Sequence, residues 1–473
     1  MEAVDKARKF LDHNLHERQN VVVVHGFPSV LAWDVEEVPV AEILEDRKRQ
    51  RGAGLTKTLD LYLGIPYCPK TKPAKCGYCL FPVEDYTGNP AVETYFEYLQ
   101  REGELYRALF DDEPLYGIFF GGGTSNLYRA DKYPQLMDMV RRIFPRMAPG
   151  AEITLEGLPA LFTREKLDRI KEAGMTRISM GAQQMNDELN QLSGRKQTAR
   201  HVLQCVEWAR ERGLGCNVDL IFGWPRQTVA TMVGDLELLI SSGVEDITHY
   251  ELHIGGPTDF AVNRRDELPS PAQNLELYRV SRDLLTSHGF RQVTAYNWRK
   301  VGVTSGFEEG VEHDFDGLQA WGWGYAAASF FTRASASGEA PGWLFKNATT
   351  VQAYKAALDA GRFPVERGYR CAPEDVRLAS LFRHLHGMRV DRAAYRVAFA
   401  RDVVEEFAGI WQALEERGLV AIDADEIRVI GDGVFYTPTI QGLLGLARYQ
   451  ELRTALYKKH RKLATIQHIL GSS

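Results

Sequence analysis

The stretch Leu59-Asp-Leu-Tyr-Leu-Gly-Ile-Pro-Tyr-Cys68 leads an apolar run directly into the loop Cys68-Pro-Lys-Thr-Lys-Pro-Ala-Lys-Cys76-Gly-Tyr-Cys79. The apolar residues from 59 to 65, which are followed by a proline, predict a β-strand that ends just before the loop. The loop carries three thiols and little apolar material, so it is poorly suited to a core. The predicted strand, followed at once by a loop with three cysteines, is therefore the starting point for predicting both the fold and the chemistry of the site.

The same rhythm continues towards the C-terminus, because short apolar runs alternate with segments of helical periodicity. The predicted strands are 59–65, 116–120, 152–156, 177–180, 216–222 and 247–253. The predicted helices are a segment from Val92 to Leu109 and the ranges 163–173, 198–212 and 227–240, with Thr163 and Thr198 as N-caps. Strands separated by helices predict an α/β fold with a parallel sheet, either doubly wound or all or part of a (β/α) barrel.

Polar and glycine residues follow these strands at their ends. In a barrel, functional side chains gather beyond the carboxyl ends of the strands. The residues that the sequence places there are Cys68, Gly121–Gly123, Glu156, Gln183 and Asp219. We therefore expect them to lie near one another.

The size and composition are those of a globular protein of several domains. A chain of 473 residues predicts two to four domains, and 57 basic against 63 acidic residues give a net charge of −6. This charge favours neither nucleic acid nor anionic lipid as a partner. Because the sequence lacks a recognisable secretory signal and any long apolar run, we expect a cytoplasmic protein without a membrane partner. Six cysteines are too few for a disulfide framework.

Changes of pattern divide the chain into four predicted regions. Residues 1–55, with the apolar run Val21–Val24, form an extension packed on the main domain, and residues 56–260 form the core barrel. Residues 261–370 extend the sheet and cover the pocket. Residues 371–473 form a winged-helix-like domain, with helices at 373–385 and 400–417, strands at 418–422 and 427–430, and a basic helical tail at 456–467.

Three neighbouring cysteines favour a metal site. A structural zinc site prefers four protein ligands, whereas three thiolates on a [4Fe-4S] cluster leave one iron free for a small chelating molecule. Cys68, Cys76 and Cys79 are thus predicted to hold such a cluster. A zinc site and a purely structural set of cysteines remain alternatives.

The sequence Phe120-Gly-Gly-Gly-Thr-Ser125 follows the second predicted strand. Glycines there permit a close approach of the backbone and expose N–H groups that suit a carboxylate or amine of a ligand. A purely steric role for these glycines is equally consistent with the sequence.

Several motifs occur in order along the chain. They are Tyr62-Leu-Gly-Ile-Pro-Tyr-Cys68, the three cysteines with Tyr78, Gly121-Gly-Gly-Thr124, Arg177-Ile-Ser-Met-Gly-Ala-Gln183, Gly194-Arg195 and Asp219-Leu-Ile-Phe-Gly-Trp-Pro225. Together they resemble the oxygen-independent coproporphyrinogen III oxidase (HemN-like) family of radical SAM enzymes, over about residues 59–258. The resemblance implies a partial (β/α)6 barrel, a [4Fe-4S] cluster chelated by S-adenosylmethionine (SAM), and reductive cleavage of SAM to a 5′-deoxyadenosyl radical.

The resemblance also implies roles for individual residues. The three cysteines would hold the cluster, Tyr78 would pack near the adenine, and Gly121, Gly122, Gly123 and Thr124 would meet the methionine end of SAM. Tyr62, Glu156, Gln183, Arg195 and Asp219 would belong to the residues around SAM, some of them facing a second SAM molecule. These side chains suit SAM chemically, because an amine needs a carboxylate partner and a carboxylate needs an arginine. A structural ion pair remains the alternative for each charged residue.

The chain departs from the family pattern at four places. The cysteine spacing is C-x7-C-x2-C rather than C-x3-C-x2-C, so the loop has four extra residues. Gly64 replaces a histidine, Leu80-Phe81 replaces a further cysteine, and Ser125 replaces a proline. These departures weaken porphyrinogen decarboxylation as the reaction more than they weaken radical SAM chemistry.

Other candidate features have simpler explanations. His249 and His253 lie in a strand-like segment, and Cys205 and Cys216 fit buried core positions. Trp321, Trp323 and Tyr325 could stack on a flat substrate, although packing in a glycine-rich segment is favoured.

The reaction expected from the sequence is radical methyl or methylene transfer to an sp2 carbon of a planar small molecule, with a second SAM, as in class C methyltransferases and cyclopropanases. The alternatives are anaerobic tetrapyrrole modification, either decarboxylation or ring opening, and a haem-binding chaperone. The expected partners are a planar or aromatic substrate and an electron donor such as flavodoxin or ferredoxin, whereas nucleic acid is not expected.

Overall fold

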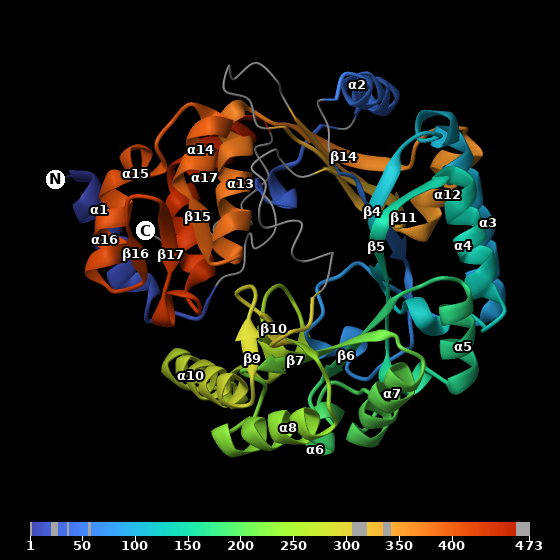
Figure 1. Ribbon diagram of the computed structural model, residues 1–473, viewed down its shortest axis with the longest axis horizontal. Helices are drawn as coiled ribbons and strands as arrows, with labels where there is room; N and C mark the ends of the chain where they lie inside the picture. The colour runs from blue at the N-terminus through green and yellow to red at the C-terminus, as the bar shows by residue number, and fades with distance from the viewer. Residues whose placement is uncertain are drawn as a thin grey trace.

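A row of parallel strands forms the centre of the fold (Figure 1). The computed structural model describes residues 2–19, 27–35, 37–54, 58–304, 319–333 and 342–459. The parallel strands are β1 (Asp60–Ile65), β4 (Pro114–Gly122), β5 (Arg146–Gly157), β6 (Arg177–Gln183), β7 (Gly215–Phe222) and β8 (Asp246–Glu251). Each coincides with a strand predicted from the sequence, with ends that differ by a few residues.

Helices connect these strands and lie on the outer side of the curved sheet (Figure 1). They are α3 (Asn89–Tyr106), α4 (Lys132–Ile143), α5 (Arg164–Glu172), α7 (Ala199–Glu211) and α8 (Val229–Ser241), with the short α6 (Asp187–Gln191) before α7. The predicted cap Thr163 accepts a hydrogen bond from the backbone N–H of Lys166, and α7 follows Thr198. Buried residues such as Leu99 and Leu167 turn the apolar faces of these helices towards the sheet.

Within the described residues the sheet contains twelve strands, with β14 and β9 at the two ends of the strand order. Beyond β1 come β11 (Gln319–Gly324), β12 (Ala328–Phe331), β13 (Trp343–Asn347) and β14 (Val365–Arg370); beyond β8 come β10 (Asn297–Lys300) and β9 (Phe290–Gln292). β11 is parallel to β1, and the other five added strands are antiparallel to their neighbours. The result is the expected partial barrel, extended at both sides.

The aromatic segment around β11 belongs to the core. Trp321, Trp323 and Tyr325 are all buried, and the indole N–H of Trp323 donates to the carbonyl of Leu99 in α3. The ring centroids of Trp321 and Tyr106 lie 4.8 Å apart. These side chains therefore pack the sheet extension against α3, as the favoured interpretation of the sequence predicts.

The C-terminal region contains helices and a three-stranded sheet. Its elements are α13 (Pro373–His386), β15 (Arg389–Asp391), α14 (Arg392–Phe399), α15 (Val403–Glu406), α16 (Ala408–Glu416), β16 (Val420–Ile422), β17 (Glu426–Val429) and α17 (Thr437–Lys459). The two predicted strands pair as an antiparallel hairpin. β15 adds a third strand that is not predicted from the sequence.

The single helix predicted at 400–417 is wrong. Ala400 ends α14 in the left-handed conformation (φ 53°), and Asp402 accepts hydrogen bonds from the backbone N–H groups of Val404 and Glu405 to begin α15. Phe407, with φ −122°, then separates α15 from α16. The predicted tail helix also begins much earlier, at Thr437, and its part from 460 to 467 lies outside the described residues.

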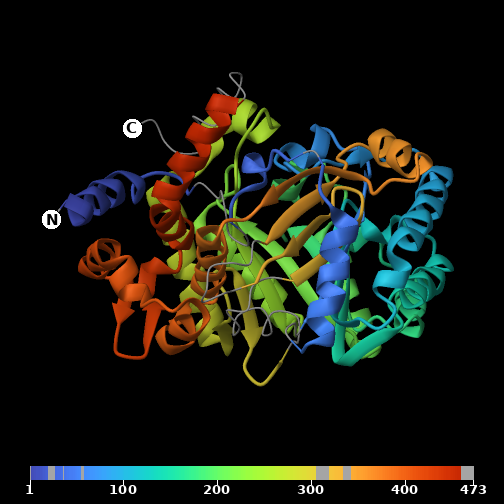
Figure 2. The same ribbon diagram turned by 90° about the horizontal axis from the view of Figure 1, so that it is seen from above.

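The two helices of the N-terminal extension pack on different regions of the chain. α1 (Glu2–Asn14) lies beside the C-terminal helices, where Arg8 pairs with Glu416 at 2.8 Å (Figure 2). α2 (Val40–Gly52) instead joins the main sheet region, because buried Arg47 pairs with Glu113 at 2.8 Å. Packing on the main domain thus holds for α2 but not for α1, and the run Val21–Val24 lies outside the described residues.

The remaining elements are β2 (Tyr67–Cys68), β3 (Glu84–Asp85), α9 (Asp259–Asn263), α10 (Pro271–Ser287) and α12 (Val351–Asp359). Within the part of the chain that the structure describes, no helix is both long and apolar enough to cross a membrane.

Candidate metal and cofactor site

The three predicted ligand cysteines lie in one loop after β1. All three are free and partly exposed, and Cys68 ends the short strand β2. Lys75, Cys76 and Gly77 are consecutive residues in the left-handed region, with φ values of 52°, 57° and 74°. Two non-glycine residues in this conformation need support from their surroundings.

The side chain of Thr71 supplies part of this support. Its Oγ1 accepts a hydrogen bond from the backbone N–H of Cys76 at 3.0 Å and donates to the carbonyl of Pro73 at 2.7 Å. A Cβ at Gly77 would lie 2.9 Å from a ring atom of Phe260, so glycine is needed where α9 packs on the loop. The extra residues of the loop therefore form a defined turn that presents Cys76.

The thiols are close enough to influence one another. Burial raises the pKa of Cys68 to about 11, the Thr124 hydroxyl opposes this shift by donating towards Cys68 Sγ at 3.3 Å, and the charges of Cys76 and Cys79 raise the pKa further. A group of thiolates in this loop thus needs positive charge, which bound iron supplies. Among the described residues, no group of three metal-binding side chains is close enough to hold a single ion.

Arg195 joins the thiol loop to the end of β6. Its Nε lies 3.4 Å from Cys76 Sγ, one terminal nitrogen donates to the carbonyl of Gly181 at 2.6 Å, and the other donates to the hydroxyl of Tyr78 at 3.2 Å. The preceding Gly194 has φ 72°, and a Cβ there would lie 2.4 Å from the Lys72 carbonyl oxygen. The Gly194-Arg195 motif is therefore explained by close contact with the cysteine loop.

The glycine-rich end of β4 approaches the same loop. The backbone N–H groups of Gly123 and Thr124 donate to the carbonyls of Ile65 and Tyr67, at 2.7 and 2.8 Å. A Cβ at Gly123 would lie 2.5 Å from the Tyr67 carbonyl oxygen. These two N–H groups are thus occupied within the protein, and the geometry favours the steric explanation of the glycines.

Two carboxylates lie on β5 and β7, the strands on either side of β6. Burial raises the pKa of Glu156 to about 8, and the charge of Asp219 raises it further. Burial also raises the pKa of Asp219 to about 6, although Asn217 Nδ2 donates to Asp219 Oδ1 at 2.7 Å. Both side chains keep part of their surface accessible. A cation bound between them would stabilise their ionised forms.

Tyr62 and Gln183 complete the predicted set. The Tyr62 ring stacks on Phe119 with centroids 6.1 Å apart, and burial together with the charge of Glu156 raises its pKa. Gln183 has φ 67° where the pairing of β6 with β7 shifts register. A Cβ at Gly181 would lie 2.6 Å from Gln183 Nε2. The irregular strand end thus turns the Gln183 amide towards Gly181, which also accepts the hydrogen bond from Arg195.

Three residues that support the predicted site residues are not themselves predicted from the sequence: Trp224, Phe260 and Asn217. Tyr78 packs edge-on against Trp224, with centroids 5.1 Å apart, and also contacts Phe260. The signal for Asn217 lies in its position two residues before Asp219, which puts both side chains on the same face of β7. Trp224 belongs to the quoted motif that begins at Asp219, but its packing on Tyr78 becomes visible only in the fold.

Two of the positions at which the chain differs from the family pattern are explained by their local surroundings. A Cβ at Gly64 would lie 2.1 Å from the Tyr325 carbonyl oxygen, so a histidine would not fit without movement of β11. At the position of the missing cysteine, the ring of Phe81 comes within 3.2 Å of a Cβ placed on Gly122, while Leu80 is 59% exposed.

The other residues singled out in the sequence lie apart from this set. His249 is buried in β8 beside the Phe222 ring, and burial lowers its pKa to about 3. Cys205 is buried in α7 and donates to the Pro159 carbonyl, whereas Cys216 in β7 is partly exposed.

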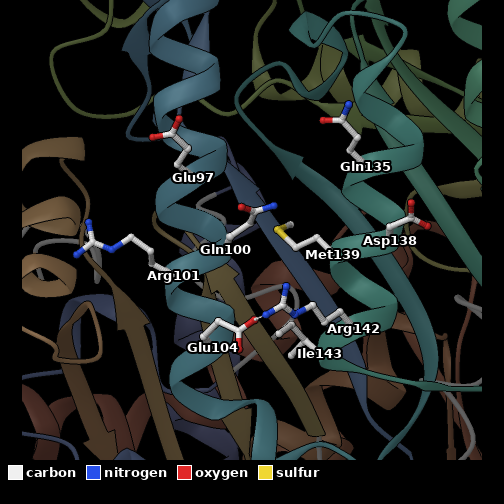
Figure 3. A pocket seen from close by; sticks show the side chains of 9 residues that line it. All are labelled: Glu97, Gln100, Arg101, Glu104, Gln135, Asp138, Met139, Arg142 and Ile143. Atoms are coloured by element: carbon white, nitrogen blue, oxygen red, sulfur yellow. Dashed lines mark ion pairs between the residues drawn. The ribbon is translucent and has the colours of Figure 1, made fainter.

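A separate cavity of about 620 Å³ lies between α3 and α4 (Figure 3). The ion pair between Arg142 and Glu104, at 2.7 Å, spans the two helices there. Its lining contains none of the predicted site residues.

Comparison with known proteins bears on the family and the fold. Residues 63–239 match the family described as the radical SAM superfamily. Similar proteins include the haem chaperone HemW of Bacillus subtilis (27% identity, 76% of this chain and 92% of the relative), the anaerobilin synthase of Escherichia coli O157:H7 (26%, 80% and 82%) and HemW of Mycobacterium tuberculosis (30%, 57% and 69%). The solved structure of coproporphyrinogen III oxidase (HemN) from Escherichia coli has the same fold, with a TM-score of 0.75 at 21% identity over 89% of this chain and 96% of that chain.

Proposed function

We propose that this chain, which belongs to the radical SAM superfamily and within it to the HemN- and HemW-like proteins, modifies a tetrapyrrole-type small molecule by radical chemistry. Membership of the superfamily brings a [4Fe-4S] cluster and SAM as cofactors, which makes the protein a radical SAM enzyme. The named relatives act on or bind coproporphyrinogen and haem, which supports a tetrapyrrole as the substrate class.

The residues fit these cofactors. Cys68, Cys76 and Cys79 would bind three irons, and donors from Thr124 and Arg195 already point at two of the sulfur atoms. Hydrogen bonds to ligand sulfur stabilise its negative charge and tune the potential of a cluster. When bound, such a cluster would supply the electron for the reductive cleavage of SAM.

The carboxylates and the arginine would orient SAM. Glu156 and Asp219 can accept hydrogen bonds from its amine and ribose, and their charge suits its sulfonium. Arg195 holds the cysteine loop against the end of β6, which fixes the distance between the thiols and these carboxylates. The observation that carries the proposal is this one contact, because it joins the metal-binding loop to the strand ends that bear the cofactor residues.

Tyr78 would form one wall of the same site. Its ring is held by Trp224 and Phe260, so its position does not depend on a ligand. An aromatic face fixed in this way suits stacking on a purine. Methyl or methylene transfer with a second SAM, the reaction first expected from the sequence, has no support in the relatives named above.

Product analysis tests the proposal. The protein is reconstituted with iron and sulfide without oxygen, reduced with dithionite, and incubated with SAM and either coproporphyrinogen III or haem. We expect 5′-deoxyadenosine and a changed tetrapyrrole, without S-adenosylhomocysteine. Formation of both nucleoside products would favour methyl transfer instead, and haem binding without SAM cleavage would favour a chaperone.

A pair of cysteine variants provides the matched control. Cys76→Ala should lose iron, sulfide and SAM cleavage, whereas Cys371→Ala, at a buried cysteine outside the loop, should keep all three. Full cluster content in Cys76→Ala would remove this residue from the ligand set.

A further inference from the structure

The cysteine loop carries an unusual local charge. Between Cys68 and Cys79 the sequence contains Lys70, Lys72 and Lys75 but no aspartate or glutamate, in a protein whose net charge is −6. All three lysines are exposed. Lys70 pairs with Asp85 at 3.2 Å, whereas neither Lys72 nor Lys75 forms an ion pair with any described residue. The loop therefore presents uncompensated positive charge next to the predicted cluster ligands.

A second segment adds a lysine at the same place. The backbone of Lys72 touches Gly194 so closely that a Cβ on this glycine would lie 2.4 Å from the Lys72 carbonyl oxygen. Two residues later, Lys196 is exposed, and it too lacks an ion pair among the described parts of the chain. Arg195, between them, reaches inward to Cys76 Sγ at 3.4 Å. The segment thus turns one cation towards the thiols and leaves the next one at the surface.

These lysines are poorly suited to holding the small cofactors. Their side chains are exposed, whereas the carboxylates and Arg195, which suit SAM, are partly buried at the strand ends. Exposed ammonium groups that lack acidic partners contribute little to stability. They do raise the rate at which an oppositely charged partner meets that surface.

We propose that Lys72, Lys75 and Lys196 form the docking surface for an acidic electron-carrier protein that reduces the cluster. The inference rests on the proposed function, since it assumes a cluster at the three cysteines. The carrier would be a small protein with a reduced flavin or iron–sulfur centre; it loses one electron, and the cluster gains that electron. Such encounters are small and transient, so steering by charge matters more than a large apolar interface. Lys75 directly precedes Cys76, so a carrier docked here would lie beside the cluster.

The test follows the rate of cluster reduction in the reconstituted holoenzyme. Reduced flavodoxin of strongly negative charge is mixed with the protein in an anaerobic stopped-flow instrument. The charge-reversed variant is Lys72→Glu/Lys196→Glu, and the control is Lys9→Glu, at an exposed lysine of α1 on the far C-terminal helices. We expect the double variant to be reduced at least about tenfold more slowly at low salt, and the control to match the wild type.

Measurements of salt dependence and of binding distinguish a loss of carrier docking from a disturbance of the cluster by the substitutions. Reduction of the wild type by flavodoxin should slow about tenfold or more between about 50 and 500 mM salt, because charge steering is screened. The rate of reduction by dithionite should be the same in the wild type, the double variant and the Lys9→Glu control. The double variant should bind oxidised flavodoxin at least about tenfold more weakly than the wild type does. If charge reversal disturbs the cluster, Lys72→Gln/Lys196→Gln provides the milder comparison, with a severalfold loss expected.

Several outcomes would overturn the proposal. One is a flavodoxin rate that does not depend on salt, and another is an equal rate in wild type and both lysine variants. Salt-sensitive binding of RNA that is lost in the double variant, with unchanged flavodoxin reduction, would assign the lysines to a different partner. Failure of the proposed function is distinguishable, because then the dithionite-reduced wild type would produce no 5′-deoxyadenosine.

Discussion

Arg195 Nε lies 3.4 Å from Cys76 Sγ, so the arginine expected beside SAM also contacts a predicted cluster ligand. Its other nitrogens donate to the Gly181 carbonyl and the Tyr78 hydroxyl. Sequence motifs alone suggest that removing Arg195 would affect SAM binding and leave the cluster intact. The geometry predicts that both would change. Asp219 instead accepts a hydrogen bond from Asn217 and, among the described residues, forms none with a cysteine of the loop.

Arg195→Ala should therefore weaken SAM binding and also change the reduction potential or stability of the cluster. Asp219→Asn should weaken SAM binding alone. Each loses a charge-assisted contact of roughly 1.5–3 kcal/mol, which corresponds to about a tenfold to hundredfold loss of affinity. Equilibrium binding of SAM, iron content and redox titration check the difference. Arg164→Ala, at an exposed ion pair with Glu211, is the control, and unaltered binding in both site variants would remove these residues from the SAM site.

The affinity for SAM should rise with pH in the acidic to neutral range. Burial raises the pKa of Glu156 to about 8 and that of Asp219 to about 6, so both carboxyl groups are largely protonated below pH 6. Cationic SAM favours their ionised forms, so binding should strengthen as they lose protons. Dissociation constants measured from about pH 5.5 to about pH 7.5 test this trend, and Glu156→Gln should flatten it. Affinity that falls as the pH rises would contradict the assignment.

The strands of the barrel could be predicted because parallel strands are buried on both faces. Such strands leave continuous apolar runs, as in 216–222, and all six predicted strands occur in the structure. The carboxyl ends of all the parallel strands lie at one edge of the sheet, which is why Glu156 and Asp219 could be placed at the same edge before the fold was known. Conversely, the prediction of one helix at 400–417 is wrong. The apolar periodicity of the sequence continues across Phe407, but the backbone leaves the helical conformation there.

Contacts between distant segments could not be predicted in the same way. The contact of Gly194 with Lys72 joins the loop after β6 to the cysteine loop, and no local pattern records it. Likewise, the N–H groups of Gly123 and Thr124 could face either a ligand or a backbone carbonyl. Only the fold shows that Ile65 and Tyr67 accept their hydrogen bonds.

Glu102 should be a main stabiliser of the contact between α3 and the sheet extension. Its buried carboxyl group accepts hydrogen bonds from the Gly324 N–H and Asn347 Nδ2, both at 2.9 Å, and from the Tyr354 hydroxyl. Glu102→Ala leaves buried donors without partners, so the free energy of unfolding should fall by about 3 kcal/mol. Burial raises the pKa of Glu102 to about 8, so the neutral Glu102→Gln should cost much less.

Urea unfolding of the two Glu102 variants measures this difference. Glu97→Ala, at an exposed position on the same helix, is the control and should change the free energy of unfolding by less than about 0.5 kcal/mol. Equal losses in Glu102→Ala and Glu102→Gln would show that side-chain volume, and not the hydrogen bonds, is what matters here.

His249 should make the protein sensitive to acid. Burial lowers its pKa to about 3, whereas an unfolded histidine titrates near about 6.5. Its contribution to stability is complete above about pH 6.5 and is lost as the pH falls, because the unfolded state takes up a proton that the folded state excludes. The free energy of unfolding should fall, through this histidine, by close to about 1.4 kcal/mol for each unit by which the pH drops between about 6 and 4.

His249→Gln removes this titration and should flatten the pH dependence of the free energy of unfolding, even if the variant is less stable at pH 7. His253 contributes in the same direction, since burial and the charge of Arg18 lower its pKa to about 4, so the double variant should be flatter still. His13→Gln, at an exposed position in α1, should leave the slope unchanged. Denaturant unfolding across this pH range decides the matter, because parallel curves for wild type and His249→Gln would mean that other groups cause the loss of stability in acid.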